Sequence, residues 1–284
     1  KTDFKKNTFF SKASKPKTLV ASYDLVRKMR ASFLILGPLL ARYGFAEVSM
    51  PGGCAIGSRP IDLHIDGLKK MGVNFIIKDG YVRGMIDGRL KGSEVKLKKK
   101  SVGATENLMM AGSLAKGKTI IINAAKEPEI VDLGNFLNKM GAHIKGHGTD
   151  IIKINGKNKL NGCDFKIMPD RIEAGTFALC VLGCSGKIIL QNINEIVADH
   201  LEKIFSPIKQ LKFKKMKKKT ELIVYRDRPI TSSLKIKTAP YPGFPTDLQA
   251  QLIAALTISK SISEISENIF ENRFMHVSEL KRMG

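Results

Sequence analysis

The chain has 284 residues, of which 43% are hydrophobic, and this is enough apolar material for more than one domain. It has 48 Lys and Arg against 26 Asp and Glu, which gives a formal net charge of +22. No apolar run approaches the length of a transmembrane helix, and the first residues lack the apolar core and cleavage site of a signal peptide, so we expect neither a membrane protein nor a secreted one.

Three Met-Gly pairs mark the ends of similar segments. "KKMG" ends at Gly72, "NKMG" at Gly141 and "KRMG" at Gly284, so the first two lie 69 residues apart and the last two 143. The second interval is about twice the first, which predicts a silent copy that ends near residue 212. Self-similarity at a fixed spacing indicates repeated supersecondary units.

Each unit is predicted to run helix, strand, helix and two strands. Gly should stop each second helix, and the Asp79–Gly80 pair in the strand pair 73–86 is a hairpin-turn signal. In chain order, the first helices are expected at 22–44, 101–117, 170–186 and 245–259, the strands at 46–50, 118–124, 187–193 and 262–270, and the second helices at 59–72, 127–141, 195–205 and 274–284.

The pattern predicts an α/β fold whose first helices pack inward on a sheet. Leu25, Met29, Phe33 and Leu36 would lie on one face of a continuous helix. The chain begins inside one unit and ends inside another, so we expect it to be a fragment of a larger repeat protein.

The segment from Gly112 to Thr119 matches the phosphate-loop pattern G-x-x-x-x-G-K-[ST]. A phosphate loop follows a strand and opens a helix, whereas here a helix over about 105–114 comes first and the strand comes after. We therefore interpret this match as a helix-to-strand turn.

The sequence predicts no metal site. His143 and His147 are four residues apart in a turn-rich strand pair, and Cys180 and Cys184 are four apart in an apolar helix, where core packing is expected. No two of the four cysteines, which also include Cys54 and Cys163, form a C-x-x-C pair, so reduced thiols in a cytoplasm are the default expectation.

Cys54 stands apart from the other cysteines. Glycines surround it, Arg59 follows, and a helix begins just after. A nearby cation and the amides ahead of a helix lower the pKa of a thiol, so Cys54 is predicted to be reactive, either as a nucleophile or as a proton donor. An incidental loop cysteine is the alternative.

The predicted helix starts form a second set of candidates. Ser101 and Val102 follow Lys99 and Lys100 at one helix start, Arg30 lies on the polar side of the first helix, and Asp247 lies at or near an N-cap. Capping alone is the plainer interpretation of Asp247. If the helix starts converge, these residues would surround an anion site.

Seven stretches together resemble a known family. They are "SYDLVRKMRAS" (22–32), "PGGCAIGSRPIDLHIDGL" (51–68), "SVGATENLMMA" (101–111), "AAKEPEIVDL" (124–133), "DRIEAGTF" (170–177), "YPGFPTDLQAQ" (241–251) and "IFENRFMHVSEL" (269–280). Spread over nearly the whole chain, they are similar to the UDP-N-acetylglucosamine 1-carboxyvinyltransferases. The related shikimate-pathway enolpyruvyl transferase shares the fold but lacks the cysteine loop.

This resemblance implies two inside-out α/β domains, each made of three repeats with sheets outside and helices within. The first domain would span 1–168 and contain the cysteine loop as a lid, and the second, truncated one would span 169–284. The active site would lie between them.

The resemblance also implies residue roles. Cys54 matches the proton donor that bonds to phosphoenolpyruvate, and Asp247 matches the carboxylate beside the sugar hydroxyl, where it could act as a base. The implied substrate-binding positions are Arg30, Arg59, Pro60, Ile61, Asp62, Leu63, Lys99, Lys100, Ser101, Val102 and Ile269. The implied partners are UDP-N-acetylglucosamine and phosphoenolpyruvate, with no cofactor, metal, membrane or nucleic acid.

The implied reaction is enolpyruvyl transfer to the sugar 3′-hydroxyl, the first committed step of peptidoglycan synthesis. The family's lysine–asparagine pair near its N-terminus and its phosphoenolpyruvate-binding arginine near its C-terminus have no counterpart here. Six units of this size would need about 420 residues, so we expect the 284-residue chain to be inactive alone.

The alternative from another class is a basic nucleic-acid-binding protein, which the charge of +22 motivates. The chain has no Trp and only 7% aromatic residues, so it lacks the stacking side chains that such proteins use.

Overall fold

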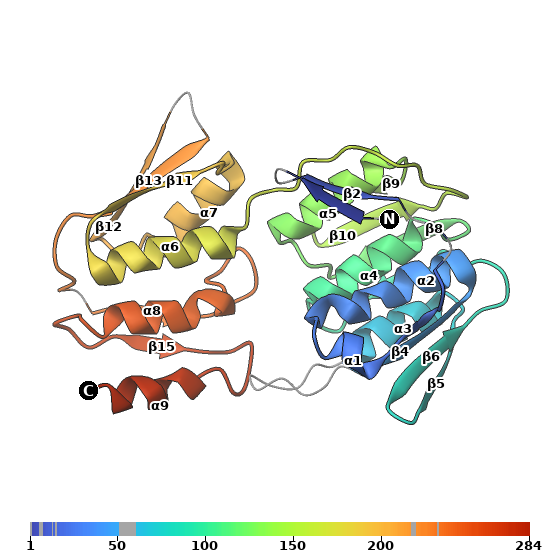
Figure 1. Cartoon of the computed structure of the whole chain (residues 1–284), viewed down its shortest axis with the longest axis horizontal. Helices are drawn as coiled ribbons and strands as arrows, with labels where there is room; N and C mark the ends of the chain where they lie inside the picture. Colours follow the sequence, from blue (N-terminus) through green and yellow to red (C-terminus); the bar gives the residue numbers. More distant parts are fainter. Residues whose placement is uncertain are drawn as a thin grey trace.

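The computed structural model describes residues 2–5, 8–12, 14, 16–50, 61–216, 220–231 and 233–284. It confirms the α/β class and the repeated unit: small sheets lie on the outside and helices pack between them (Figure 1). The elements up to β10 form one group, on the right of the figure, and α6 to α9 form a second group on the left. None of the described helices is both long and apolar enough to cross a membrane.

Three of the sheets share one topology, which is the structural form of the repeat. In each, the last strand of the unit lies in the middle of three antiparallel strands. One of its neighbours is the strand that follows the first helix, and the other is the strand that directly precedes it in the chain. The sets are β4 (Phe45–Ser49), β6 (Tyr81–Met85) and β5 (Asn74–Lys78); β8 (Lys118–Ile122), β10 (Ile151–Asn155) and β9 (His143–Lys145); and β11 (Lys187–Gln191), β13 (Glu221–Arg226) and β12 (Leu211–Lys215). The predicted silent copy is therefore a complete unit.

The helices also follow the predicted order. Positive φ angles at Gly72, Gly141 and Gly284 confirm that glycine ends three of the second helices. The first helices are α2 (Leu36–Tyr43), α4 (Val102–Gly112), α6 (Arg171–Cys184) and α8 (Gln249–Leu256), and the second helices are α3 (Asp62–Lys70), α5 (Pro128–Lys139), α7 (Glu195–Phe205) and α9 (Met275–Arg282).

A short strand before the first helix was not predicted. The strands β3 (Val20–Ala21), β7 (Glu94–Lys96) and β14 (Lys235–Lys237) pair in parallel with β4, β8 and β15 (Glu264–Ser266). The helix between each pair is thus a β-α-β crossover, which places the helix against one face of its sheet. A further hairpin of β1 (Thr2–Lys5) and β2 (Thr8–Ser11) precedes these units.

The predicted continuous first helix over 22–44 is wrong. It is divided into α1 (Tyr23–Val26), a 3₁₀ helix η1 (Arg30–Ile35) and α2. Phe33 and Leu36 are buried as expected, but Leu25 and Met29 are each 60% exposed. Pro38 explains the change from η1 to α2, because a proline in the interior of one long helix would clash with the preceding turn, whereas in the first turn of α2 it is tolerated.

Two hydrophobic clusters hold the fold together. The first extends from Ala21 to Ile154 and includes α4, which contacts η1, α2, α3 and α5 and is mostly buried. The second extends from Ala174 to Leu256 and includes α6, which contacts α7 and α8 and keeps one exposed face. The two helices are thus the main helical contributors to the two clusters.

The rejected phosphate-loop match is also explained by the fold. Gly112 ends α4, and Lys118 and Thr119 lie in β8. The glycines of the motif connect the end of a helix to a strand, whereas a phosphate loop opens a helix.

Candidate functional site

Many of the predicted substrate-binding positions lie at the starts of three helices. The N-cap of α4 is confirmed, because the side-chain oxygen of Ser101 accepts the N–H of Ala104 at 3.3 Å. The positions at these starts are Arg30 in η1, Ile61, Asp62 and Leu63 at the start of α3, and Lys99, Lys100, Ser101 and Val102 at the start of α4.

The starts of α3 and α4 lie side by side. A Cβ atom on Gly103, in the first turn of α4, would lie 3.4 Å from Cε1 of His64, in the first turn of α3. The 3₁₀ helix η1 in turn contacts α4. The amide groups at a helix start carry partial positive charge, so the two adjoining starts of α3 and α4 favour an anionic ligand.

The two lysines before α4 differ in their surroundings. The ammonium group of Lys100 contacts the carboxylate of Asp150 and donates to the carbonyl of Ala124 at 3.2 Å, while Lys126 contacts the other oxygen of Asp150. These hydrogen bonds from Lys100 and Lys126 lower the pKa of Asp150. Lys99 is exposed. The structure thus gives Lys100 an ion pair within the fold and leaves the Lys99 ammonium facing solvent.

Asp247 lies next to Leu248, the N-cap of α8, as the sequence predicts. It is part of a 3₁₀ helix, η2 (Thr246–Leu248), and among the described residues its side chain caps no backbone N–H, so the capping interpretation is wrong. Its carboxylate instead accepts a hydrogen bond from Arg273 at 2.6 Å. The N–H of Ile269, another predicted position, donates to Glu267 at 2.7 Å, and Glu267 also accepts from Thr246 at 2.8 Å, so Asp247 and Ile269 belong to one cluster.

Three predicted site residues, Cys54, Arg59 and Pro60, lie outside the described residues. Among those that are described, the helix starts of the first group form one set, and Asp247 with Ile269 forms a second set in the other group. The described part of the chain shows no hydrogen bond or ion pair between these two sets.

The two groups are joined instead by a partly buried ion pair. Arg171, at the start of α6, donates through Nε to Glu129, in the first turn of α5, at 3.0 Å. Glu106 of α4 lies near this pair, and burial together with the charges of Glu129 and Glu127 raises its pKa to about 7. At neutral pH this carboxyl group is therefore protonated in part of the molecules.

The comparisons with known proteins agree with this architecture. A family model described as EPSP synthase (3-phosphoshikimate 1-carboxyvinyltransferase) matches residues 1–284. The chain belongs to this family. The crystal structure of the enolpyruvyl transferase NikO from Streptomyces tendae superposes with a TM-score of 0.81 at 19% identity and covers 100% of this chain and 67% of that one. An EPSP synthase from Acinetobacter baumannii has a TM-score of 0.58 at 17% identity and covers 83% and 54%.

Sequence relatives in the family are much closer. The UDP-N-acetylglucosamine 1-carboxyvinyltransferase 1 of Caldanaerobacter subterraneus subsp. tengcongensis is 51% identical over 268 residues, which are 94% of this chain and 63% of that protein. The UDP-N-acetylglucosamine 1-carboxyvinyltransferase of Bdellovibrio bacteriovorus is 50% identical over 278 residues, 97% and 66% of the two chains. The chain therefore spans about 63% of the first relative's length. The resemblance inferred from the sequence is confirmed.

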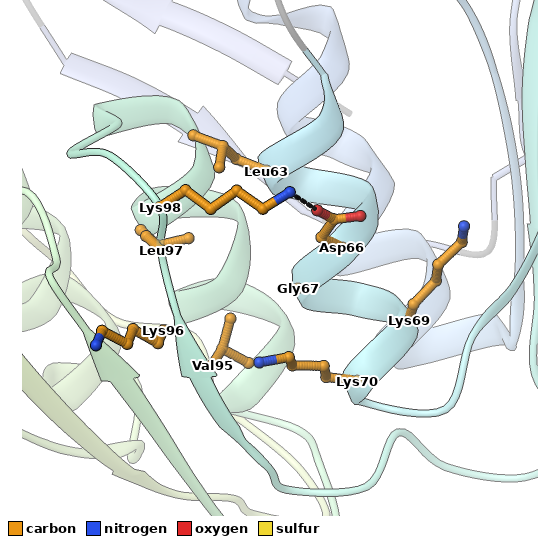
Figure 2. Close-up of a pocket in the computed structure, with 9 residues that line it drawn as sticks. All are labelled: Leu63, Asp66, Gly67, Lys69, Lys70, Val95, Lys96, Leu97 and Lys98. Carbon is orange, nitrogen blue, oxygen red and sulfur yellow. Dashed lines mark hydrogen bonds and ion pairs between the residues drawn. The ribbon is translucent and has the colours of Figure 1, made fainter.

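A pocket of about 300 Å³ opens beside one of the predicted positions of this family member. It lies between α3 and β7, with Leu63 at one end and Leu97 and Val95 on its wall, and Lys98 pairs with Asp66 across it at 3.2 Å (Figure 2). In Figure 2 the side chains of the remaining lysines that line it do not converge on one point. The pocket is thus a shallow extension of the Leu63 side of α3.

The structure corrects the sequence prediction for two of the cysteines. Cys180 and Cys184 are exposed, so the expectation of core packing is wrong. The helix α6 is apolar all round, and the sequence could not indicate which face meets the core. No group of three or more potential metal ligands occurs among the described residues.

Sequence reasoning missed Arg273 as the partner of Asp247. Arg273 lies in the stretch "IFENRFMHVSEL", which the resemblance included, and its guanidinium also lies 5.6 Å from the centre of the Phe270 ring. An arginine among aromatic residues, close to a predicted position such as Ile269, was the available signal.

Proposed function

We propose that the protein to which this chain belongs transfers the enolpyruvyl group of phosphoenolpyruvate to the 3′-hydroxyl of UDP-N-acetylglucosamine and releases phosphate. The observation that supports this most strongly is the 51% identity over 268 residues to a UDP-N-acetylglucosamine 1-carboxyvinyltransferase. The reaction would be the first committed step of peptidoglycan synthesis, and we place it in the cytoplasm.

The helix starts support a role in holding the nucleotide sugar. Arg30, the run Arg59 to Leu63 and the run Lys99 to Val102 would bind it from the first group, and Ile269 from the second. A diphosphate has the charge that helix N-termini and an exposed lysine such as Lys99 favour.

Cys54 and Asp247 are the proposed catalytic residues. As the 3′-oxygen of the sugar forms a bond to C2 of phosphoenolpyruvate, Asp247 takes the hydroxyl proton and the thiol of Cys54 gives a proton to C3. The tetrahedral adduct then loses phosphate from C2 and a proton from C3, which restores the carbon–carbon double bond as an enol ether. Arginines and lysines would stabilise the charge that develops on phosphate.

Arg273 would orient the proposed base. Its guanidinium holds one carboxylate oxygen of Asp247 at 2.6 Å, and its side chain is only 14% exposed. The second carboxylate oxygen remains available to accept the hydroxyl proton.

The two proposed domains, 1–168 and 169–284, are supported by the two hydrophobic clusters, which extend from Ala21 to Ile154 and from Ala174 to Leu256. A site between them would receive its sugar-binding helix starts from one domain and its base from the other. This arrangement requires the two domains to approach each other around the substrates.

The test is an assay of phosphate release from phosphoenolpyruvate and UDP-N-acetylglucosamine, with the full-length chain that contains this sequence. Cys54→Ala should lower kcat by about 10²–10⁴-fold, whereas Cys54→Asp should retain activity because a carboxylic acid can also donate a proton. Cys163→Ala is the matched control and should leave the rate unchanged. Wild-type turnover in Cys54→Ala, or no turnover in the wild type, would overturn the proposal.

A further inference from the structure

One amide side chain of α4 connects η1, α2 and α3. Asn107, in α4, is fully buried, and its Oδ1 accepts the N–H of Gly37 at 2.7 Å. Its Nδ2 donates to the carbonyl of Phe33 at 3.3 Å and lies 2.9 Å from Nδ1 of His64. Gly37 is in α2, Phe33 is in η1 and His64 is in α3, so a single side chain of α4 holds all of its neighbours in this region.

The bond to Gly37 replaces a missing helix cap. The first N–H groups of a helix have no partner within the helix, and the N-cap residue of α2, Ile35, offers no side-chain hydrogen bond. A Cβ atom on Gly37 would lie only 2.2 Å from Oδ1 of Asn107, so a glycine is needed for α2 to approach α4 this closely. The contact therefore sets the distance between these two helices.

The hydrogen bonds also determine the protonation of His64. Because the N–H of Gly37 can only donate, Oδ1 of Asn107 must face it, and Nδ2 must face His64. An amide nitrogen only donates, so Nδ1 of His64 must be unprotonated and the proton of the neutral ring must be on Nε2. Burial agrees with a neutral ring, since it lowers the pKa of His64 to about 4, against a smaller opposing effect of Asp62.

The ring of His64 also contacts residues next to the proposed substrate site. It packs edge-on against Phe33, with ring centroids 5.2 Å apart, and it adjoins Gly103 in the first turn of α4. His64 directly follows Asp62 and Leu63 in the chain, and Phe33 is in the same 3₁₀ helix as Arg30. Of the elements that the pair contacts, η1 and α3 each include a proposed substrate-binding position, and so does α4, which contains Asn107.

We propose that Asn107 and His64 are positioning residues for the nucleotide-sugar site: their hydrogen-bonded pair fixes η1 and the first turns of α3 and α4 relative to one another. This inference rests on the proposed function for the identity of the ligand. Because all three elements would bind the same ligand, a small displacement of one of them weakens binding even though neither Asn107 nor His64 touches the ligand. Phosphoenolpyruvate, whose expected partners lie elsewhere, is affected less.

The first experiment measures steady-state kinetics of the full-length protein. His64→Leu removes the acceptor, and Asn107→Asp replaces the donor with a second acceptor. Both should raise KM for UDP-N-acetylglucosamine by about tenfold or more, while kcat and KM for phosphoenolpyruvate change by about threefold or less. His64→Gln, whose side-chain oxygen can accept from Asn107, should restore much of the affinity.

Ile152→Ala is the matched control for lost stability. Ile152 is fully buried in β10, a strand of the outer sheet, and its truncation leaves a cavity without altering the pair. It should leave KM for UDP-N-acetylglucosamine unchanged. If Ile152→Ala raises this KM as much as His64→Leu does, or if His64→Leu leaves it within about twofold of wild type, the inference is wrong.

A second measurement decides the case even if a variant does not fold. Nitrogen NMR of the His64 ring in the wild-type protein should show an unprotonated Nδ1 and a protonated Nε2 at pH 7, and addition of UDP-N-acetylglucosamine alone should shift these signals. A proton on Nδ1 would overturn the inferred geometry. Failure of the proposed function is distinguishable, because the wild type would then show neither turnover nor a response to the nucleotide sugar.

Discussion

Arg171 and Glu129 join the two groups of elements through a hydrogen-bonded ion pair. Nε of Arg171 lies 3.0 Å from one oxygen of Glu129 and 3.3 Å from the other. The arginine side chain is 10% exposed and the glutamate 40%, so the pair is shielded on one side. The Tyr241 ring lies 5.9 Å from the guanidinium carbon. The pair therefore connects the first turn of α5 to the start of α6.

The ion pair of Arg171 and Glu129 predicts that removal of the glutamate charge lowers the stability of the fold. Glu129→Gln should lower the free energy of unfolding by about 1–2 kcal/mol, because the hydrogen bond becomes neutral on one side while Arg171 stays buried. Urea denaturation near pH 5.5 is suitable, since Glu106 is still mostly protonated there. The control is Glu279→Gln, which alters an exposed pair with Arg282 and should cost less than about 0.5 kcal/mol. Equal losses of unfolding free energy in Glu129→Gln and Glu279→Gln would contradict a stabilising role for the ion pair.

Glu106 predicts a stability that decreases with rising pH. Its pKa is about 7 in the folded protein and near 4.5 in an unfolded chain, so the folded state binds more protons between these values. Stability is then lost as the pH rises from about 4.5 to 7, by at most about 3 kcal/mol, and is constant above that.

Glu106→Gln tests this dependence because glutamine does not titrate. The variant should match the wild type near pH 5 and be more stable near pH 8, as measured by urea denaturation at both values. Since the charge of Glu129 contributes to the raised pKa of Glu106, Glu129→Gln should also reduce the pH dependence. A wild-type protein that loses no stability relative to Glu106→Gln between pH 5 and pH 8 would refute the assignment.

The repeated unit could be predicted because its signals are local. Glycine after a helix and the Asp79–Gly80 turn depend only on backbone conformation, and both residues of that turn have positive φ angles. The strand β7 was missed because its alternation is short and lies among lysines: Val95 and Leu97 are buried while Glu94, Lys96 and Lys98 are exposed.

Partners far apart in the sequence could not be predicted. Asp247 and Arg273 are 26 residues apart, and Glu129 and Arg171 are 42 apart, so nothing in the local pattern pairs them. Ser101, whose capping partner is three residues away, was predicted correctly as a helix start. The sequence thus located the site residues on their elements, whereas the choice of ion-pair partners depends on how the units pack.

His200 predicts the opposite pH dependence to Glu106. It is buried in α7, and neither ring nitrogen has a hydrogen-bond partner among the described residues. Burial, followed by the charges of Arg171 and Lys203, lowers its pKa to about 4. An unfolded chain takes up the proton near pH 6.5 and the folded one does not, so stability is lost as the pH falls from about 6.5 to 4.

His200→Phe should remove this loss and keep the ring contact with Tyr241, whose centroid is 4.8 Å from that of His200. Near pH 7 the variant should be within about 1 kcal/mol of wild type, since no hydrogen bond is given up. Near pH 5 it should be more stable by about 2 kcal/mol. His143→Gln, on an exposed position of β9, is the control. A variant that is no more stable than wild type near pH 5 would contradict the buried neutral state.

Variants of Asp247 and Arg273 test two different roles: proton transfer by Asp247 and its orientation by Arg273. Asp247→Asn removes the proposed base and should lower kcat of the full-length enzyme by about 10²–10⁴-fold. Arg273→Lys keeps a positive charge but not the fixed planar geometry of the guanidinium, so it should lower kcat by about tenfold and leave the protein folded. Arg282→Lys, on the exposed part of α9, should change nothing. If Arg273→Lys lowers stability but not kcat, Arg273 supports only the fold, and Asp247 is oriented by other groups.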